Sequence, residues 1–300
     1  MGKRKRRKKK KPEETETEEM KNMEPEDTPP EDGNLGNPET GDAPPTEENI
    51  PEPDLPVEKK PPEEQKRIVR CPVCDGSGME QEQKDGVTVC KCEDCGLLFR
   101  NPRPSLGILA EQRNKAFQNA MSSSHGKKIR EQSRIAVDIM KAYHHLTSGR
   151  PAALNAFGKK VLDVNCGLGL RLREFQKYGW DVYGIDTSAN AVQYAKACAL
   201  DAQQEFLDAV PFKDGMFDLV LFWDNFGDLG DPVEAVEVLS RILKSSGLLY
   251  VHLGEPSESE QLFCFDPDSL RRVFMQNRFT AILENEDDQG YFFWFRKKEA

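Results

Sequence analysis

A strand, a glycine-containing turn and a helix follow one another over residues 160–175, with the sequence KVLDVNCGLGLRLREF. The first five residues form a short apolar run that predicts a buried strand, and the segment after the turn predicts a helix. Gly167 and Gly169 occupy the turn, and Asn165 stands where a third glycine would be expected. Because asparagine tolerates positive φ better than other non-glycine residues, we expect the turn to form. This unit favours a parallel sheet whose strands alternate with helices.

Strands and helices continue to alternate after this unit. Apolar runs predict further strands at 180–186, 204–207, 217–223 and 248–253. Capping and stop signals predict helices at 170–179, 188–200, 231–247 and 266–278. The last two predicted strands, 279–284 and 291–297, are joined by a short turn and must be antiparallel, because a parallel pair needs a long crossover. We therefore predict an α/β protein with a doubly wound, mostly parallel, seven-stranded sheet.

Charge and composition divide the chain into four parts. Residues 1–66 are first basic and then acidic and proline-rich, with too little apolar surface to offset the entropy lost on ordering, so we predict disorder. Residues 67–103 hold a cysteine cluster, residues 104–158 have a helical pattern that predicts a connector or cap, and residues 159–300 hold the alternating elements. The formal net charge is -10, but residues 67–300 carry only about -4, which gives no general argument for nucleic-acid binding.

The basic head, residues 3–11, could bind nucleic acid or an acidic surface, or could serve as a nuclear address in a eukaryote. The alternative is a solvated tail that the neighbouring acidic stretch partly neutralises. No apolar run reaches membrane-spanning length and no hydrophobic region follows the head, so we expect neither a membrane span nor a signal peptide. Eight cysteines, four of them with metal-site spacing, fit a reducing compartment, and we expect a cytoplasmic protein.

Two C-x-x-C pairs, Cys71–Cys74 and Cys92–Cys95, predict a zinc ribbon. Zinc prefers four soft ligands in a tetrahedron, and each C-x-x-C turn presents two thiolates to one metal. Cys90 is an alternative third ligand, but Cys92 preserves the spacing and the glycine that follows the second pair. With four protein ligands the zinc has no open position, so we expect a role in structure or recognition. Free thiols or a redox pair are the alternative.

Three aspartates flank the glycine turn in the order expected of a nucleotide-like ligand site. Asp163 ends the first strand, Asp186 ends the second and Asp208 follows the third. An acid after the second strand can accept hydrogen bonds from both hydroxyls of a ribose. A nicotinamide oxidoreductase would also carry that acid, but its fingerprint needs a glycine at the third position after Gly169, where this chain has Leu172. Asp163 can instead pair with a ligand's ammonium group or order water around it.

These features together resemble the class I S-adenosylmethionine-dependent methyltransferases, over roughly residues 159–300. VLDVNCGLG is similar to the family's first motif, VYGIDTS to its second, and PFKDGMFDLV with DPVEAVEVLSRILKSSGLL to a later strand–helix–strand segment. The segment FCFDPDSLRRVFMQNRF is similar to a helix of small-molecule members, and a zinc ribbon ending in CGLLFRNPRP resembles one bacterial arrangement. The resemblance implies a Rossmann-like fold, S-adenosylmethionine as cofactor beside structural Zn²⁺, and a small-molecule methyl acceptor.

The resemblance also implies roles for individual residues. It places the cofactor at the carboxyl edge of the sheet, with Asp163, Asn165, Gly167 and Gly169 at its methionine part, Asp186 at its ribose and Asp208 near its adenine. Asp224, after the fourth strand, would face the transferable methyl group and the acceptor. For Asp186, Asp208 and Asp224 the alternative is an ordinary residue without a role at the cofactor, such as a solvated loop acid.

A general base is needed when the acceptor must lose a proton. Many relatives carry Glu-His after the fourth strand, where this chain has Gly227-Asp228. Asp228 could replace that histidine, and His252 at the end of the fifth strand is another candidate base, with a structural role as its alternative. His144 and His145 could approach the cofactor or lie on an exposed helix face. The competing function is a catalytically inactive module that keeps the cofactor fold and binds a protein or nucleic acid.

Overall fold

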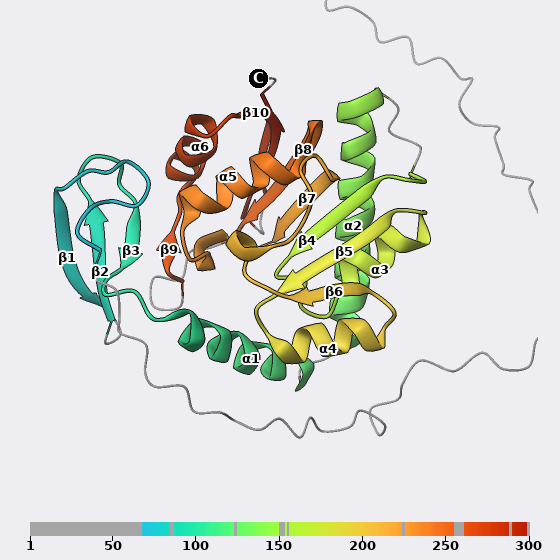
Figure 1. Cartoon of the computed structure of the whole chain (residues 1–300), viewed down its shortest axis with the longest axis horizontal. Coiled ribbons are helices and arrows are strands. Elements are labelled where there is room, and N and C mark those ends of the chain that lie inside the picture. Colours follow the sequence, from blue (N-terminus) through green and yellow to red (C-terminus); the bar gives the residue numbers. More distant parts are fainter. Residues whose placement is uncertain are drawn as a thin grey trace, which may run out of the picture. The chain divides into compact units, whose positions relative to one another are not determined.

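The structure is a computed structural model of the 300-residue chain and describes residues 68–84, 87–122, 125–149, 154, 156–223, 226–254, 261–287 and 290–298. All of these lie within one compact unit that spans residues 45–300 (Figure 1). The head predicted to be disordered, residues 1–66, lies outside the described residues. In the described part of the chain, no helix combines the length and apolar character needed to cross a membrane.

The centre of the unit is a seven-stranded sheet with the strand order β10-β11-β8-β7-β4-β5-β6. Strands β8 to β6 in this order are parallel, whereas β11 is antiparallel to both of its neighbours. The strands are β4 (Lys160–Val164), β5 (Asp181–Asp186), β6 (Asp201–Gln204), β7 (Phe217–Trp223), β8 (Leu243–Leu253), β10 (Phe279–Asp287) and β11 (Gly290–Lys297). The predicted α/β fold, with its mostly parallel seven-stranded sheet and antiparallel final hairpin, is confirmed.

Helices cover both faces of this sheet (Figure 1). Side chains alternate along the strands, so that each face contributes to a separate apolar core. One core contains residues of α2 (His125–Ser148), α3 (Leu170–Lys177) and α4 (Ala189–Ala197), and the other contains residues of α5 (Pro232–Ile242) and α6 (Pro267–Gln276). α1 (Leu106–Ser122) adds Leu109 to the second core. The segment predicted to be helical, residues 104–158, contains α1 and α2.

Two helices beside the sheet, α4 and α5, begin at side-chain caps that the sequence predicts. Ser188 Oγ accepts a hydrogen bond from Ala191 N (3.1 Å) at the start of α4. Asp231 Oδ1 accepts hydrogen bonds from Val233 N (2.9 Å) and Glu234 N (3.1 Å) at the start of α5. These bonds satisfy amide groups that have no partner within the helix, and both predicted caps are confirmed.

The third strand of the parallel sheet lies earlier than predicted. The strand expected at residues 204–207 is β6, which ends at Gln204. The apolar side chain that enters the core from this edge strand is Ala202, whereas Leu207 lies in a short 3₁₀ turn, Leu207–Ala209. The apolar pair at 206–207 therefore marks the connection after the strand and not the strand itself.

The helix predicted to extend to Gly247 ends five residues earlier, at Ile242. β8 begins at Leu243, which is fully buried and pairs with Phe217 at the start of β7. Burial of Leu243 in the core and pairing with β7 override the helical pattern of the segment. Gly247 consequently lies within the irregular first part of β8 and not at a helix end.

A smaller antiparallel sheet precedes α1. Its strands are β1 (Met79–Lys84), β2 (Val87–Cys92) and β3 (Leu98–Arg100), followed in the order by β9 (Phe263–Cys264). β9 belongs to the connection between β8 and α6, so a strand from the region of the seven-stranded sheet completes the sheet of the ribbon. Phe99 of β3 is almost completely buried and belongs to the same apolar core as α5 and α6.

An ion cluster forms where β4 and β7 begin. The buried carboxylate of Asp218 accepts hydrogen bonds from Lys159 Nζ (3.0 Å), Lys160 N (3.0 Å) and Lys244 Nζ (2.6 Å). Burial alone would raise the pKa of Asp218, but these hydrogen bonds outweigh it and the pKa is lowered. The cluster should therefore stabilise the folded chain while Asp218 is ionised.

We expect Asp218→Asn to lower the free energy of unfolding at neutral pH by about 1–2 kcal/mol, because hydrogen bonds to a charged group are lost while both lysines stay partly exposed. Because the pKa of Asp218 is lower in the folded chain than in the unfolded chain, its ionised carboxylate stabilises the protein fully above the unfolded-chain pKa of about 3.9. This stabilisation is lost as the pH falls through the pKa of the folded chain. Urea unfolding should thus show wild type and variant converging below about pH 4. Asp181→Asn, at the exposed start of β5, is the matched control; an equal loss there would contradict this prediction.

Candidate functional site

The glycine turn between β4 and α3 has left-handed backbone at three positions. Asn165, Gly167 and Gly169 have φ values of 54°, 55° and 63°. A Cβ atom on Gly169 would lie 2.3 Å from Leu200 Cδ1, whereas one on Gly167 would meet nothing within 4 Å. Gly167 therefore faces open space into which a ligand can fit. The interpretation of Asn165 as a backbone substitute for glycine is confirmed by its φ.

Asp186 ends β5 directly beside this turn. Its Oδ2 accepts a hydrogen bond from Gly167 N (2.9 Å), its Oδ1 accepts one from Ser188 N (2.8 Å), and the residue is 4% exposed. Burial raises the pKa of Asp186, and the two amide hydrogen bonds and the nearby Arg113 guanidinium offset part of this effect. The backbone therefore orients the carboxylate, which keeps further lone pairs for ligand hydroxyl groups.

Asp163 lies deeper in the fold than Gly167 and Asp186. It is 0% exposed and lines neither cavity described below. Its Oδ1 accepts a hydrogen bond from Arg171 Nη2 (3.0 Å) and its Oδ2 accepts one from Arg171 Nε (3.1 Å). Arg171 Nη1 also donates to Gln132 Oε1 in α2 (2.6 Å). Asp163 thus anchors an arginine that links α3 to α2, and its predicted contact with the methionine part of the cofactor stays a prediction.

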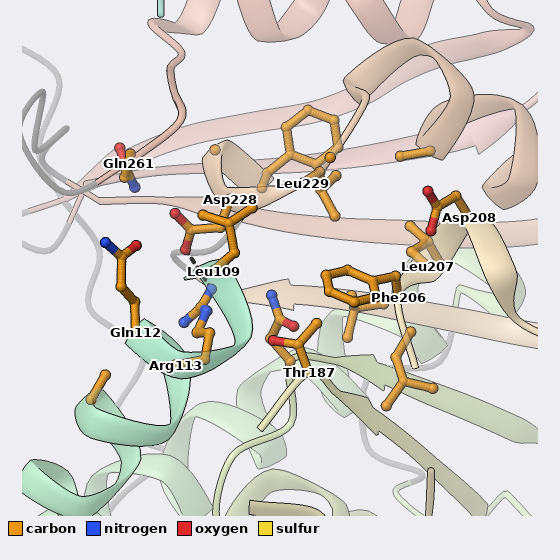
Figure 2. A pocket seen from close by; sticks show the side chains of 18 of the residues that line it. Leu109, Gln112, Arg113, Thr187, Phe206, Leu207, Asp208, Asp228, Leu229 and Gln261 are labelled. Carbon is orange, nitrogen blue, oxygen red and sulfur yellow. Dashed lines mark hydrogen bonds and ion pairs between the residues drawn. The ribbon is translucent and has the colours of Figure 1, made fainter. Parts of the chain in front are cut away.

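Two cavities adjoin at the carboxyl edge of the sheet. The first, of about 750 Å³, is lined by Asp208, and the second, of about 580 Å³, is lined by Gly167 and Asp186. Asn165 and Arg113 line both cavities, so the two meet between the glycine turn and α1. In Figure 2, Asp208 and Gln261 lie at opposite ends of the first cavity. A ligand that reaches from Gly167 to Asp208 would pass between Asn165 and Arg113.

Helix α1 covers the junction of the two cavities. Arg113 forms an ion pair with Asp228 across the first cavity (Figure 2). Asn114 Oδ1 accepts a hydrogen bond from Ser188 Oγ (2.7 Å), and the Phe117 ring meets the Tyr194 ring edge-on, with centroids 6.2 Å apart. α1 therefore bridges the loops that follow β5 and β7. Nothing in the local sequence marks these contacts, because each joins residues far apart in the chain.

The candidate catalytic residues occupy different places. Asp228 lines the first cavity, where it is held by Arg113. His252, in β8, lines the second cavity, is 2% exposed and stacks nearly parallel on Trp223, with ring centroids 3.9 Å apart. Asp224 lies outside the described residues. Of the two candidates that are described, only His252 shares a cavity with Gly167 and Asp186.

The histidine pair near the end of α2 lies away from these cavities. The His144 ring contacts that of Trp180, with centroids 6.4 Å apart, and Trp180 directly precedes β5. His144 is therefore at the amino edge of the sheet, opposite the glycine turn. His145 is exposed. The alternative interpretation, a helix face without a role at the cofactor, fits this placement.

Four cysteine sulfur atoms gather in the ribbon. All lie within 4.8 Å of one another, and they belong to Cys71, Cys74, Cys92 and Cys95. The Sγ atoms of Cys71 and Cys95 are 3.5 Å apart, as are those of Cys74 and Cys92. Ligands about 2.3 Å from one tetrahedral zinc would be about 3.8 Å apart, so the cluster fits zinc. Cys90 lies outside the cluster, where its Sγ accepts a hydrogen bond from Asn101 Nδ2 (3.5 Å).

Comparison with known proteins identifies the region that carries the glycine turn. Residues 162–251 match the family described as "Methyltransferase domain". The ubiquinone biosynthesis O-methyltransferase of Pectobacterium atrosepticum is 33% identical over 101 residues, which cover 31% of this chain and 42% of the relative. The enzyme of the same name from Vibrio campbellii is 27% identical over 139 residues, which cover 41% and 59%. The chain thus spans about half the length of these relatives.

Among solved structures, a SAM-dependent methyltransferase from Aquifex aeolicus is 20% identical, with a TM-score of 0.43, and the match covers 58% of this chain and 97% of that chain. The family match extends from β4 into β8, so it includes the glycine turn and Asp186. Residues 162–251 of this chain therefore match a methyltransferase domain. The ribbon, α1 and α2 lie outside the matched residues.

Proposed function

We propose that this protein transfers the methyl group of S-adenosylmethionine to a small-molecule acceptor. The observation that carries the proposal is the Asp186 carboxylate, held by the Gly167 amide beside a left-handed glycine turn within a matched methyltransferase domain. S-adenosylmethionine supplies an activated methyl group, so that alignment of the acceptor provides much of the rate. Asn165, Gly167 and Asp186 would hold the methionine and ribose parts, and Asp208 would lie at the adenine end.

Two measurements test this function. Calorimetry with S-adenosylhomocysteine tests the cofactor site, and no detectable heat at millimolar ligand would defeat the proposal at its first step. Release of S-adenosylhomocysteine from S-adenosylmethionine tests turnover, with a cell extract divided by filtration into small molecules and macromolecules. The O-methyltransferase relatives support an acceptor in the small-molecule fraction. Turnover on the macromolecular fraction alone would contradict that acceptor class.

We propose His252 as the general base, because it lies in the cavity of the glycine turn, whereas Asp228 is engaged by Arg113. Asp224 is the other candidate. We expect His252→Gln to lower kcat by about 10²–10⁴ and to leave the Kd for S-adenosylhomocysteine unchanged, because a base acts on the acceptor and not on the cofactor. His145→Gln, on the exposed end of α2, is the matched control. Parallel loss of S-adenosylhomocysteine binding in His252→Gln would assign it a structural role.

The ion pair between Arg113 and Asp228 favours a second candidate function, a binding module without catalysis. In this pair Arg113 engages Asp228, which is one of the candidate general bases. Such a module would bind S-adenosylhomocysteine but give no turnover on either extract fraction. A nicotinamide oxidoreductase is disfavoured, since Leu172, which is fully buried in the core, stands where its fingerprint has the last glycine.

We further propose that the cysteine cluster holds one structural Zn²⁺, because its four sulfur atoms have the spacing of a tetrahedral site. The division at residues 66, 103 and 158 into head, ribbon, helical segment and methyltransferase domain stays a prediction. Binding of nucleic acid or an acidic surface by residues 3–11 and a cytoplasmic location also stay predictions.

A further inference from the structure

The ribbon is joined to the methyltransferase domain through β9. Leu98 pairs with Cys264 and Phe99 with Phe263, and Arg100 N donates a hydrogen bond to Leu262 O (2.9 Å). The rings of Phe99 and Phe263 have centroids 6.5 Å apart, and both residues are almost completely buried. This connection combines backbone pairing with an apolar core, so displacement of β3 would also displace β9.

β9 packs in turn against the short turn Phe226–Asp228, which lines the first cavity. A Cβ atom on Gly227 would lie 2.2 Å from the carbonyl oxygen of Phe263, so the two backbones are in direct contact. The Phe226 ring lies 5.1 Å from that of Phe265, just after β9. Asp228, the last residue of the turn, pairs with Arg113 at the junction of the two cavities (Figure 2).

Two arginines from the end of the ribbon also reach this region directly. Arg100, in β3, lines the first cavity together with Gln261. The Arg103 guanidinium donates a hydrogen bond to the carbonyl oxygen of Gly230, also in the wall of that cavity. The ribbon therefore contacts the cavity wall both through β9 and through its own side chains.

The second C-x-x-C pair of the cysteine cluster, Cys92 and Cys95, lies shortly before β3 in the chain. Cys92 N donates a hydrogen bond to Leu97 O (3.0 Å), and Gly96 N donates one to Cys92 O (2.9 Å), which closes the second C-x-x-C turn. Leu97 is almost completely buried, so this turn and β3 share the same core. A metal bound by Cys92 and Cys95 would fix the turn, and its loss would release the start of β3.

We propose that the zinc ribbon positions the wall of the first cavity, so that metal bound at the cysteine cluster strengthens ligand binding at the carboxyl edge of the sheet. This inference rests on the proposed function, because that function determines the ligand used in the tests, S-adenosylhomocysteine. Phe99, Phe263 and Gly227 are positioning residues in this scheme, because they act on the cavity through Asp228 and its neighbours.

The first test removes zinc from the full chain with a strong chelator and then restores it. We expect the Kd for S-adenosylhomocysteine to rise about fivefold or more without metal, because coupling between two sites typically changes affinity by at least this factor. The Kd should recover when zinc is restored. Hydrogen exchange should become faster at residues 226–230 and 261–265, while β4 and α3 keep their protection. A metal-free chain with native circular dichroism, unchanged affinity and unchanged exchange would overturn the proposal.

Variants separate coupling from general loss of structure. Cys71→Ser should weaken zinc and S-adenosylhomocysteine binding together, whereas Cys198→Ser, outside the cluster, should change neither. Gly227→Ala should retain full zinc content yet bind S-adenosylhomocysteine more weakly, because its Cβ atom would displace β9. Wild-type affinity in Gly227→Ala would count against the proposed path. If the zinc-loaded protein binds no S-adenosylhomocysteine, the proposed function fails, and hydrogen exchange at residues 226–230 alone decides whether the ribbon positions the cavity.

Discussion

Replacing Asp186 with alanine is expected to weaken S-adenosylhomocysteine binding by roughly 3 kcal/mol or more, which is about a 100-fold rise in Kd. A buried carboxylate at the end of β5 can accept hydrogen bonds from both ribose hydroxyls, and each hydrogen bond to a charged group contributes about 1.5–3 kcal/mol. Titration calorimetry of wild type and variant measures the difference directly. The same variant should also reduce kcat/KM, because the loss persists in the transition state.

The control must separate ligand binding from the structural role of Asp186. Its carboxylate also accepts hydrogen bonds from Gly167 N and Ser188 N, so alanine leaves two amides without that partner. Asp186→Asn keeps the side-chain shape and one acceptor oxygen, and we expect intermediate affinity. Asp181→Ala changes the same residue type at the exposed other end of β5 and should leave affinity unaltered. Equal affinity of wild type and Asp186→Ala would remove Asp186 from the cofactor site.

The protonation state of Asp186 gives this prediction a pH dependence. Burial raises its pKa above the ordinary value, so the carboxylate takes up its proton at a higher pH than an exposed aspartate does. A ribose hydroxyl donates a stronger hydrogen bond to the ionised form. Affinity for S-adenosylhomocysteine should therefore fall as the pH is lowered through this raised pKa, and Asp186→Asn should lack that dependence. An identical pH profile in both proteins would contradict this assignment.

Local sequence signals predict the centre of the fold and part of the site. The apolar runs KVLDV and FDLVLFW coincide with β4 and β7, and the caps Ser188 and Asp231 are where the sequence places them. The backbone of Asn165 was also predictable, because positive φ is an intrinsic tolerance of asparagine. These features depend on residues within a few positions of one another, which a single sequence displays.

Other parts of the site depend on contacts between distant residues. The pairing of Arg113 with Asp228 spans 115 positions, and the pairing of Phe99 with Phe263 joins the ribbon to a two-residue strand that no periodic pattern marks. The early start of β8 has the same origin, since Leu243 leaves the helical pattern to pair with Phe217. Tertiary contacts decide these features, so neither propensity nor spacing could predict them.

Removal of Arg171 is expected to produce the largest loss of stability, because its partner Asp163 is completely buried. Burial raises the pKa of Asp163, and the two hydrogen bonds from Arg171 oppose this effect. Breaking a buried ion pair by removal of one partner typically costs about 3–5 kcal/mol, since an uncompensated charge remains. We expect Arg171→Met to lower the free energy of unfolding by about that amount at neutral pH, as measured by urea denaturation.

The pH dependence of Arg171→Met follows from the same carboxyl group. Without the guanidinium, the folded-state pKa of Asp163 should rise further above its unfolded value of about 3.9. The folded state then binds the proton more tightly, so the stability of the variant should fall as the pH rises from about 4 through that raised pKa and then level off. If Arg171→Met lowers the free energy of unfolding by less than about 1 kcal/mol, or by an amount independent of pH, the buried ion pair is not essential for stability.

The double variant Asp163→Leu with Arg171→Met tests whether the penalty comes from the unpaired charge. Replacement of both members of a buried ion pair by apolar residues is often close to neutral, because two desolvation penalties disappear together. We therefore expect the double variant to be more stable than Arg171→Met alone and to lose the pH dependence. Arg171 also links α3 to Gln132 of α2, so any deficit that remains in the double variant measures the contribution of that hydrogen bond and of packing.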